Sequence, residues 1–313
     1  MNKFDNGLEL STERNPLLSA GIILLFTFLG FIVIGPMIGF LLGFPFFDGS
    51  LAEYTDLIAG GNIMNDKFKI PAFVMQGTAS SIGFILIPIL LMIIYERQTI
   101  LAFFTTKKIS NILILLTIFI GISFIGFNSL FVEWNAEISL PESMNGFETW
   151  ARQFEDTAMK QTEFFTHFDS NAQFVIALLV IAIIPGIGEE LVFRGFLQNY
   201  LHISSRNIHI AIWTSAFLFS AMHMQFFGLI PRMMLGALFG YLYYWSGNLI
   251  IPIVAHVVNN AFTLIMMYVY QVKITDIDIE SVEEVSLTSF SIFAVITFSL
   301  LFVFRWINVT SND

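Results

Sequence analysis

The sequence predicts an all-α polytopic membrane protein, a bundle of about eight transmembrane helices that forms one integral membrane domain over residues 1–313. Of the 313 residues, 56% are hydrophobic and only 12% are charged, and the mean hydropathy is +0.76. Apolar runs recur along the chain, several of them near the ~20 residues that a helix needs to cross a bilayer. A soluble domain of this length does not sustain such a composition.

Eight apolar runs are the predicted spans. They cover residues 16–47, 71–95, 112–132, 174–200, 208–227, 229–245, 249–270 and 287–307. The first run is longer than a span requires and contains Gly35-Pro36 together with four other glycines. We therefore expect its helix to be tilted or kinked.

The longest polar connection, residues 133–172, separates the third and fourth spans. Phe147, Trp150, Phe154 and Phe165 recur there at helical spacing, with acidic residues between them. This pattern predicts an amphipathic helix that lies in the membrane interface or caps the bundle. A solvated surface helix fits the pattern about equally well. A second interfacial helix is expected over residues 100–104, between Arg97 and a pair of lysines.

Charge patterning predicts the orientation and the partners. The positive-inside rule places Lys107, Lys108 and Arg206 on the cytoplasmic side, and the acidic connections after the third and seventh spans outside. Both termini would then be cytoplasmic, and we expect no cleaved signal peptide. A multi-pass protein of a bacterial cytoplasmic membrane is the predicted localisation. The net charge of −10 argues against a nucleic-acid partner.

Three charged residues interrupt the fourth apolar run at Glu189, Glu190 and Arg194. Ionisable groups at membrane depth cost several kcal/mol, so they usually face a protein interior or a wet cavity and mark function. Residues four apart share a helix face, so Glu190 and Arg194 can pair, whereas Glu189 is rotated about 100° away. The spacing leaves Glu189 without a local partner. A plain ion cluster at a helix end is the alternative interpretation.

Proline and glycine positions predict local departures from regular packing. Pro185, Gly186 and Gly188 precede the charged residues and would weaken the helix, leaving backbone groups for a cavity or water to satisfy. Gly236 and Gly240 form a GxxxG pair on the sixth span, a weak indication of close helix packing.

Two histidines lie inside other spans. His223 is on the fifth run, and His256 shares a helix face with Asn260 on the seventh. A single intramembrane histidine is more often a packing residue, but two of them with Glu189 on three helices favour a site. If the spans are straight, His223 and His256 differ in depth by roughly 10 Å. The remaining histidines are expected at the interfaces, namely His167, His202 and His209.

Glu189, His223 and His256 can do two related kinds of chemistry. They can hold a divalent ion such as Zn²⁺ with an open water position. Alternatively, a Glu-His pair activates water without a metal, and the second histidine with Asn260 stabilises an oxyanion. Cysteine is absent, which excludes a thiolate ligand or nucleophile. There is also no HExxH, GxSxG or P-loop motif.

At these residues the chain resembles a known family. EExxxR at residues 189–194, FxxxH at 219–223 and HxxxN at 256–260 follow one another on successive predicted helices. This ordered set is similar to the motifs of the CAAX-protease and bacteriocin-processing (CPBP, or Abi) family of intramembrane proteases. The resemblance covers roughly residues 174–270, the protease-like core.

The resemblance implies a membrane-embedded, water-accessible cavity and an endopeptidase that cleaves membrane-associated peptides or proteins. Carried over by position, Glu189 and His223 would activate water. His256 with Asn260 would bind the oxyanion or, in the metal alternative, His256 would join Glu189 and His223 around the ion. Whether a metal is bound stays open.

Three supporting residues complete the predicted site. Glu190 and Arg194 would hold Glu189 in place, and Phe219 belongs to the FxxxH motif. Two other functions remain alternatives. One is a bacteriocin-immunity or scaffold protein of the same fold that does not cleave peptides. The other is a proton-coupled transporter that uses the same Glu/His groups as a relay, although the chain lacks a duplicated half.

Overall fold

The computed structural model describes residues 14–62, 64–97, 109–275 and 286–310. Within these ranges every regular element is helical and no strand occurs, so the predicted all-α class is confirmed. The expected interfacial helix at 100–104, with Lys107 and Lys108, lies outside the described residues, as does most of the acidic connection after the seventh span.

Seven helical segments of the described chain are long and apolar enough to cross a membrane, and the chain is an integral, multi-pass membrane protein. The segments are Pro16–Phe46, Asp66–Tyr95, Asn111–Ala136, Asn171–Ser205, Phe226–Ser246, Ile250–Gln271 and Leu287–Asn308. The first contains α1 (Pro16–Leu29) and α2 (Gly35–Gly43), the second α4 (Lys69–Ser80) and α5 (Ile87–Leu90), and the third is α6 (Asn111–Ala136). The fourth joins α8 (Asn171–Ala177), α9 (Ile184–Glu190) and α10 (Gln198–Ser205). The fifth and sixth contain α12 (Leu229–Ser246) and α13 (Ile250–Gln271), and the seventh is most of α14 (Leu287–Thr310).

The fifth predicted span is shorter than expected. Its helix, α11, covers Ile208–Ala221 and has 14 residues, a length of about 21 Å against the ~30 Å of a hydrocarbon core. The predicted continuation to Phe227 is wrong, because residues 222–228 turn back toward α12. His223 therefore lies in a turn after α11. The total number of spans stays a prediction.

Three spans widen into a π-helical segment just before a proline. These segments are Gly30–Ile34, Ser81–Leu86 and Leu178–Ile183, and the prolines are Pro36, Pro88 and Pro185. Proline has no N–H for the carbonyl four residues earlier, and a wider turn absorbs that loss. The helix consequently runs through Pro185 without a break. The predicted weakening of the helix appears as a wider turn before Pro185. The Ile181 carbonyl, four residues before the proline, lacks the N–H donor that another residue at 185 would provide.

Glycines near the charged residues allow close helix contacts. An added Cβ at Gly186 would come within 2.6 Å of Val257 on α13, and one at Gly188 within 2.6 Å of Phe84 on the second span. On α12, an added Cβ at Gly236 would lie 3.1 Å from Ala216 of α11. The close packing predicted from the GxxxG pair is therefore confirmed. Lipid is as apolar as these side chains, so van der Waals contact rather than hydrophobic burial favours such packing.

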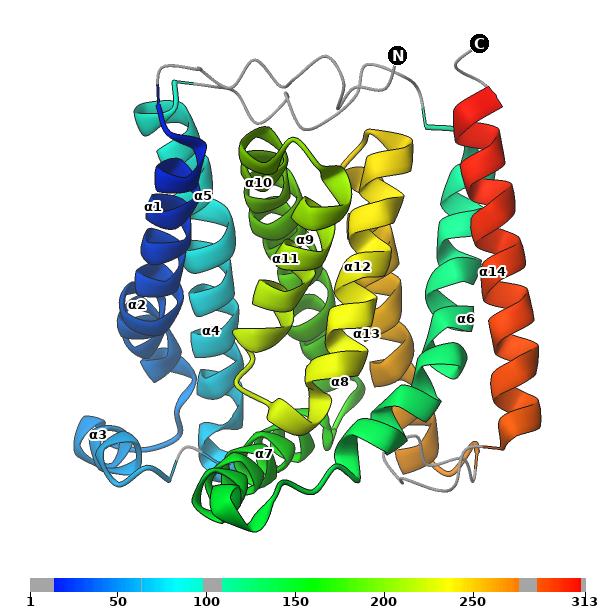
Figure 1. Ribbon diagram of the computed structural model, residues 1–313. Helices are drawn as coiled ribbons and strands as arrows, with labels where there is room; N and C mark the ends of the chain where they lie inside the picture. Colours follow the sequence, from blue (N-terminus) through cyan, green and yellow to red (C-terminus); the bar gives the residue numbers. More distant parts are fainter. Residues whose placement is uncertain (1–13, 63, 98–108, 276–285, 311–313) are drawn as a thin grey trace.

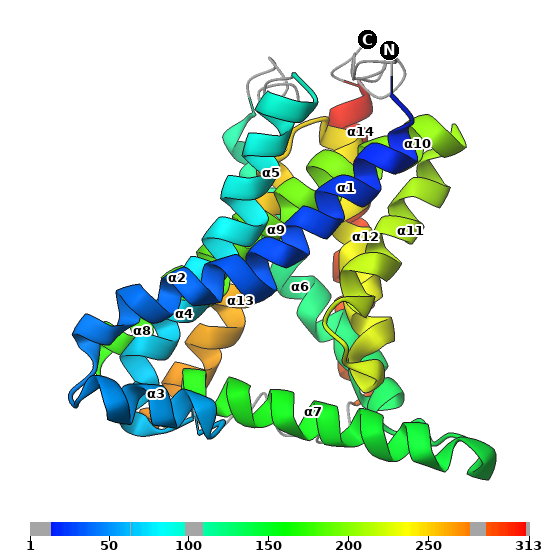
Figure 2. The same cartoon turned by 90° about the vertical axis from the view of Figure 1, so that its left-hand side faces the viewer.

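The helices between α6 and α8 lie across one end of the bundle. In Figure 2, α7 (Asn145–Thr166) runs crosswise below the spans, near α3 (Leu51–Ala59). The first residues of α1 and the last turns of α14 lie at the opposite end, as Figure 1 shows. Phe147, Trp150 and Phe154 of α7 are each about two-fifths exposed. This placement suits the amphipathic helix that the sequence predicts, whose location in the interface remains a prediction.

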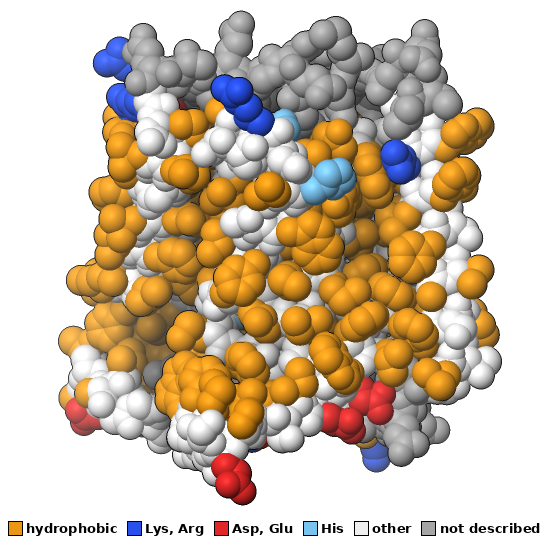
Figure 3. Space-filling view, viewed as in Figure 1, with side chains coloured by type: hydrophobic (Ala, Val, Ile, Leu, Met, Phe, Trp, Pro, Cys, Tyr) orange, Lys and Arg blue, Asp and Glu red, His pale blue; other side chains and the backbone are white. Residues whose placement is uncertain are grey.

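Charge is unevenly distributed between the two ends. On the face shown in Figure 3, most Lys and Arg side chains gather at the end where α10 finishes, and most Asp and Glu side chains at the α7 end. Hydrophobic side chains cover the band between them. The positive-inside rule would place the α10 end in the cytoplasm, as the sequence predicts.

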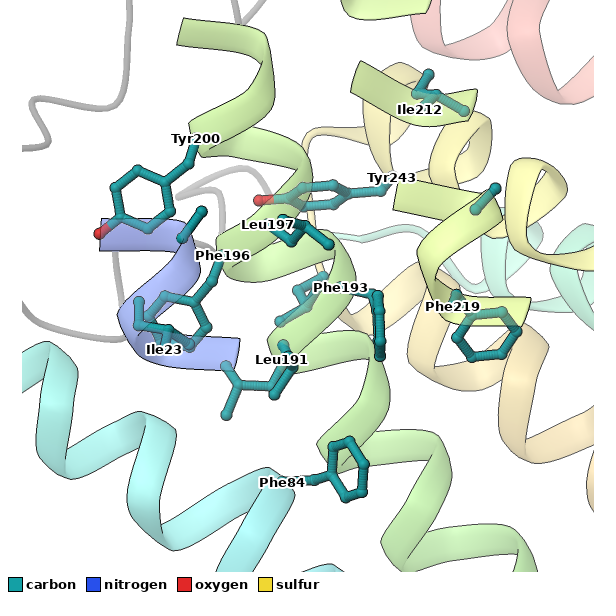
Figure 4. Packing of buried hydrophobic residues seen from close by; sticks show 14 of the residues in the cluster. Ile23, Phe84, Leu191, Phe193, Phe196, Leu197, Tyr200, Ile212, Phe219 and Tyr243 are labelled. Carbon is teal, nitrogen blue, oxygen red and sulfur yellow. The ribbon is translucent and has the colours of Figure 1, made fainter. Parts of the chain in front are cut away.

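A buried cluster positions the segment that carries the intramembrane charges. Figure 4 shows side chains of this segment and α10 between α1, the second span, α11 and α12. The cluster includes Ile23, Phe84, Leu191, Phe193, Phe196, Leu197, Tyr200, Ile212, Phe219 and Tyr243. Because these neighbours surround the segment, the side chains of residues 189–194 have few alternative positions.

Candidate active site

Glu190 and Arg194 form the predicted ion pair. Arg194 Nη1 lies 2.6 Å from Glu190 Oε1, and the side chains of Arg194 and Glu190 are 1% and 0% exposed. Arg194 Nη2 also donates to the Gly236 carbonyl at 2.8 Å, and its guanidinium lies 4.7 Å from the centre of the Phe219 ring. A buried ion pair is tolerated better when further hydrogen bonds satisfy its remaining atoms; the bond to Gly236 does this for Arg194, whereas Glu190 Oε2 is buried without a hydrogen-bond partner among the described residues. Arg194 thus connects the fourth span to α12.

His256 bonds to the same carboxylate. Its Nδ1 lies 2.8 Å from Glu190 Oε1, and its ring stacks on Phe239 with centroids 5.0 Å apart. A carboxylate at Nδ1 favours the tautomer that is protonated there, which leaves a lone pair on Nε2. The sequence did not predict this contact. Glu190 orients His256 as well as pairing with Arg194.

His223 is fixed by a similar bond to backbone. Its Nδ1 lies 2.9 Å from the Phe219 carbonyl, so its Nε2 is also the unprotonated nitrogen of the neutral ring. The Phe219 ring lies near both histidines, with centroids 5.3 Å from that of His223 and 5.8 Å from that of His256. α11 is short and ends at Ala221, so His223 lies in the turn just after it, and the Phe219 ring is in contact with both histidines.

Glu189 is partly exposed and differs from its neighbour Glu190. No hydrogen bond or ion pair links its side chain to another described residue. Its carboxylate interacts electrostatically with Glu190, His256, Arg194 and Arg232. Glu189 and His223 are not hydrogen-bonded to each other in this arrangement. Each of them interacts electrostatically with His256 and with Arg232.

Asn260 bonds to the carbonyl that Pro185 leaves free. Its Nδ2 donates to Ile181 O at 3.3 Å, and Ile181 is four residues before the proline, whose missing N–H would otherwise be the donor. Asn259 Nδ2 donates to Asn260 Oδ1 at 3.2 Å. One N–H of the Asn260 amide therefore has a structural partner, and the second is available for a ligand.

Arg232 is a site residue that the sequence reasoning missed. It lies in the first turn of α12, donates from Nη2 to Gln225 Oε1 at 2.6 Å, and interacts electrostatically with Glu189 and His223. Its Nη1 is buried without a hydrogen-bond partner among the described residues. The sequence does show Arg232 inside the apolar run 229–245. An ionisable residue at membrane depth indicates a functional site, and this holds for arginine as it does for Glu189.

Comparison with known proteins places these residues in a family. Residues 171–262 match the family model described as Type II CAAX prenyl endopeptidase Rce1-like. These residues are an Rce1-like domain. The domain contains Glu189, His223, His256 and Asn260, and at the level of the family it is of the CAAX-protease type.

One curated relative matches part of this chain. The uncharacterized protein YpbD of Bacillus subtilis (strain 168) is 30% identical over 88 residues, which are 27% of this chain and 42% of YpbD. The chain thus spans less than half the length of this relative. No solved structure matches the chain.

A cavity of about 600 Å³ lies beside the Rce1-like domain. Its walls come from α12 and α13 of the domain and from α6 and α7, which precede it. Residues of its lining include Asn128, Arg152, Glu155, Phe227, Arg232 and Asn259. The contribution of α7 places this cavity toward the acidic end of the bundle, and Arg232 connects it to Glu189 and His223.

The donor types of the Rce1-like domain suit a zinc ion, but their arrangement does not. Among the described residues, no group of three His, Cys, Asp or Glu side chains lies close enough to hold a metal ion. His256 Nδ1 is already bonded to Glu190, so only its Nε2 could bind an ion. A three-ligand site would require these groups to converge. We therefore derive no step through a metal.

Proposed function

We propose that the protein is an intramembrane endopeptidase that hydrolyses a peptide bond near the membrane with Glu189, His223, His256 and Asn260. One observation carries the proposal: the Glu189 carboxylate, which has no hydrogen-bond partner among the described residues, interacts electrostatically with His256 and Arg232, and the Nδ1 atoms of both His223 and His256 are already bonded to oxygen acceptors. Each neutral histidine thus keeps an unprotonated Nε2. A carboxylate and an imidazole with free basic atoms are the groups that general-base activation of water requires.

The first step of the proposed reaction is the activation of water by Glu189 and His223. One of these groups removes a proton as the water oxygen attacks the peptide carbonyl carbon, and the same proton later passes to the leaving amine. General-base catalysis of this kind contributes about 10²–10⁴-fold. Glu189 and His223 must come within hydrogen-bonding distance of the same water, and such contacts often tighten only when substrate binds.

His256 and Asn260 would stabilise the oxyanion that develops on the carbonyl oxygen. Asn260 has a second amide N–H that can donate to the oxyanion. His256 would donate from Nε2 only after Nε2 has taken up a proton from solvent, and Glu190 at Nδ1 would then balance the charge of the imidazolium. A single donor of this kind is typically worth about 10²–10³ in kcat. Glu190 and Arg194 hold His256 in orientation and do not need to touch the substrate.

The substrate class follows from the family description. Type II CAAX prenyl endopeptidases are the proteins that the matched family model describes, so a prenylated CAAX peptide is the first probe. A membrane-associated peptide of another sequence is the second probe. Both would approach from the bilayer, which is the other expected partner of this protein.

The test uses the purified protein in liposomes with a farnesylated CAAX peptide and a panel of membrane-associated peptides. Mass spectrometry identifies the products. We expect wild-type cleavage and a loss of at least about 100-fold in Glu189→Gln and His223→Ala. Size-exclusion profiles and melting temperatures close to wild type would show that the variants remain folded. Wild-type rates in either variant would overturn the assigned roles.

A metal-dependence test accompanies this experiment. Without a three-ligand site, we expect cleavage to survive dialysis against a chelator. The purified active protein should contain less than stoichiometric zinc. Loss of cleavage on chelation, with recovery on adding zinc, would overturn the metal-free mechanism and leave the endopeptidase proposal in place.

A further inference from the structure

The turn that carries His223 rests on a helix outside the Rce1-like domain. Residues 222–228 connect α11 to α12, and α7, which ends before the domain begins, lies against them. Phe227 N–H donates to Glu155 Oε2 of α7 at 3.1 Å. The Arg152 guanidinium lies 4.0 Å from the centre of the Phe227 ring. Phe147 meets Phe226 edge to face with centroids 5.5 Å apart.

We propose that Glu155 is a positioning residue for His223, which acts by holding the 222–228 turn against α7. This inference rests on the proposed endopeptidase function and adds to it an element that the family match does not cover. Glu155 does not touch the reacting atoms. Its contribution is to keep His223 Nε2 directed toward the site.

The backbone of the 222–228 turn does not supply an acceptor for every one of its own N–H groups, and the Phe227 N–H bonds to a side chain of α7 instead. Met224 has a φ of 58°, a left-handed conformation that is unfavourable for a side chain of this kind. Short-range bonds satisfy some of its backbone, including those from Met224 N to Ala221 O and from Gly228 N to Gln225 O. Phe227 N–H instead bonds to the Glu155 carboxylate. A charged acceptor makes such a bond stronger than a neutral one.

Movement of the turn would affect the proposed chemistry directly. His223 is four residues before Phe227, and its ring is held by a bond to Phe219 O, so displacement of the turn redirects Nε2. Gln225 in the same turn accepts from Arg232, whose charge interacts with both Glu155 and Glu189. A misplacement of about 1 Å can cost as much as 10²-fold in rate. The turn is therefore a place where α7 can control activity.

The first experiment compares three variants in the peptide-cleavage assay. Glu155→Ala removes the acceptor, and we expect kcat to fall about tenfold or more with KM within about twofold of wild type. Glu155→Gln keeps an amide oxygen that can accept from Phe227 N–H, so kcat should recover to within about threefold of wild type. Glu163→Ala, which removes an exposed acidic side chain elsewhere on α7, is the matched control and should behave as wild type.

Three kinetic outcomes would overturn the inference. One is wild-type kcat in Glu155→Ala. Another is a Gln variant as impaired as the Ala variant, because the hydrogen bond would then not be the cause. A change in KM alone would also contradict a positioning role, since it would indicate that Glu155 contacts the substrate.

A second readout does not depend on cleavage. The protein is labelled with [¹⁵N]histidine, and His223→Ala identifies the His223 resonance among the five histidines. Glu155→Ala should shift or broaden that resonance, whereas Glu163→Ala should leave it unchanged. If Glu155→Ala changes the His223 resonance while the wild type cleaves no peptide, the proposed endopeptidase function is wrong, but the effect of Glu155 on the position of His223 is supported. An unchanged resonance in Glu155→Ala overturns the coupling itself.

Discussion

At the scale of single residues, Glu190 and Glu189 are neighbours with opposite environments. Glu190 is fully buried and accepts from Arg194 and His256 through one oxygen, while Glu189 is partly exposed and has no bonded partner in the described chain. A rotation of about 100° between adjacent helical residues accounts for the difference. One carboxylate therefore holds Arg194 and His256 in place, and the other, Glu189, is the one proposed to activate water.

Arg194→Met should destabilise the protein by roughly 3–5 kcal/mol, because it leaves the Glu190 carboxylate buried without its cation. Reversible unfolding in mixed detergent micelles measures this difference. Arg305→Ala is the control, since Arg305 is exposed on α14 and should change the free energy of unfolding by less than about 0.5 kcal/mol. If Arg194→Met unfolds like the wild type, Arg194 does not brace the site.

Arg232→Gln should lower kcat/KM about five- to tenfold, because the charge that attracts Glu189 is lost in a weakly screened setting. Arg232→Lys keeps a positive charge and should lose less. Steady-state kinetics on the same peptide compares the two variants. Equal losses in both would indicate that the hydrogen bond to Gln225, and not the charge, is what matters.

At the scale of elements, α7 is the helix whose role is least evident from sequence. Its aromatic residues recur at helical spacing, which predicts an apolar face but not what covers it. In the structure Phe147 contacts the His223 turn, while Trp150 remains 46% exposed. One part of the helix thus packs on the bundle, and another is free to meet lipid.

If α7 lies in the membrane interface, Trp150 should be quenched by lipids brominated near the headgroup. The component of tryptophan fluorescence lost in Trp150→Phe should show this shallow quenching, because interfacial tryptophans lie at headgroup depth. Trp306 near the end of α14 gives a comparison through Trp306→Phe. Absence of quenching at Trp150 would favour the solvated surface helix instead.

The start of α7 should respond to acid. A hydrogen bond from Leu140 N–H, at 2.7 Å, and the Arg152 guanidinium hold the pKa of Glu148 below its usual 4.5. A lowered folded-state pKa adds stability above the unfolded value, and that stability is lost as pH falls through the folded pKa. We expect local protection of residues 138–141 to decrease below about pH 4.5.

Amide hydrogen exchange at several pH values, corrected for intrinsic rates, measures this protection. Glu148→Gln is the control, because it cannot titrate and should show the same protection above and below that range. Protection that falls equally in Glu148→Gln and in the wild type would trace the acid response to another group.

At the scale of the whole molecule, orientation is the prediction with the widest consequence. Arginine and lysine gather at the α10 end and acidic side chains at the α7 end (Figure 3). The chain has no cysteine, so single cysteines report their side without background. An impermeant maleimide should label Glu163→Cys on intact cells, and Arg206→Cys only after the cells are opened. The reverse result would place the cavity on the cytoplasmic side.

Much of the architecture follows from local pattern, and the departures have physical causes. Hydropathy runs located seven of the spans to within a few residues at most ends, but overextended the fifth. An apolar turn such as residues 222–228 has the same hydropathy as a helix, so composition cannot reveal where α11 ends. The pairing of Glu190 with Arg194 was predictable because both residues are on one helix. The bond from Glu190 to His256 was not, since it joins residues 66 positions apart.

The sequence by itself determined that this is a helical membrane protein, where its charges interrupt apolar runs, and which motif residues are candidates for chemistry. Those properties depend on composition and helical periodicity, which are local. Only the tertiary structure decided that Glu190 directs His256, that Asn260 satisfies the carbonyl freed by Pro185, and that α7 supports the His223 turn. Each of these depends on the depth and rotation of one helix against another, which close contacts such as Gly186 on Val257 determine after the spans have packed.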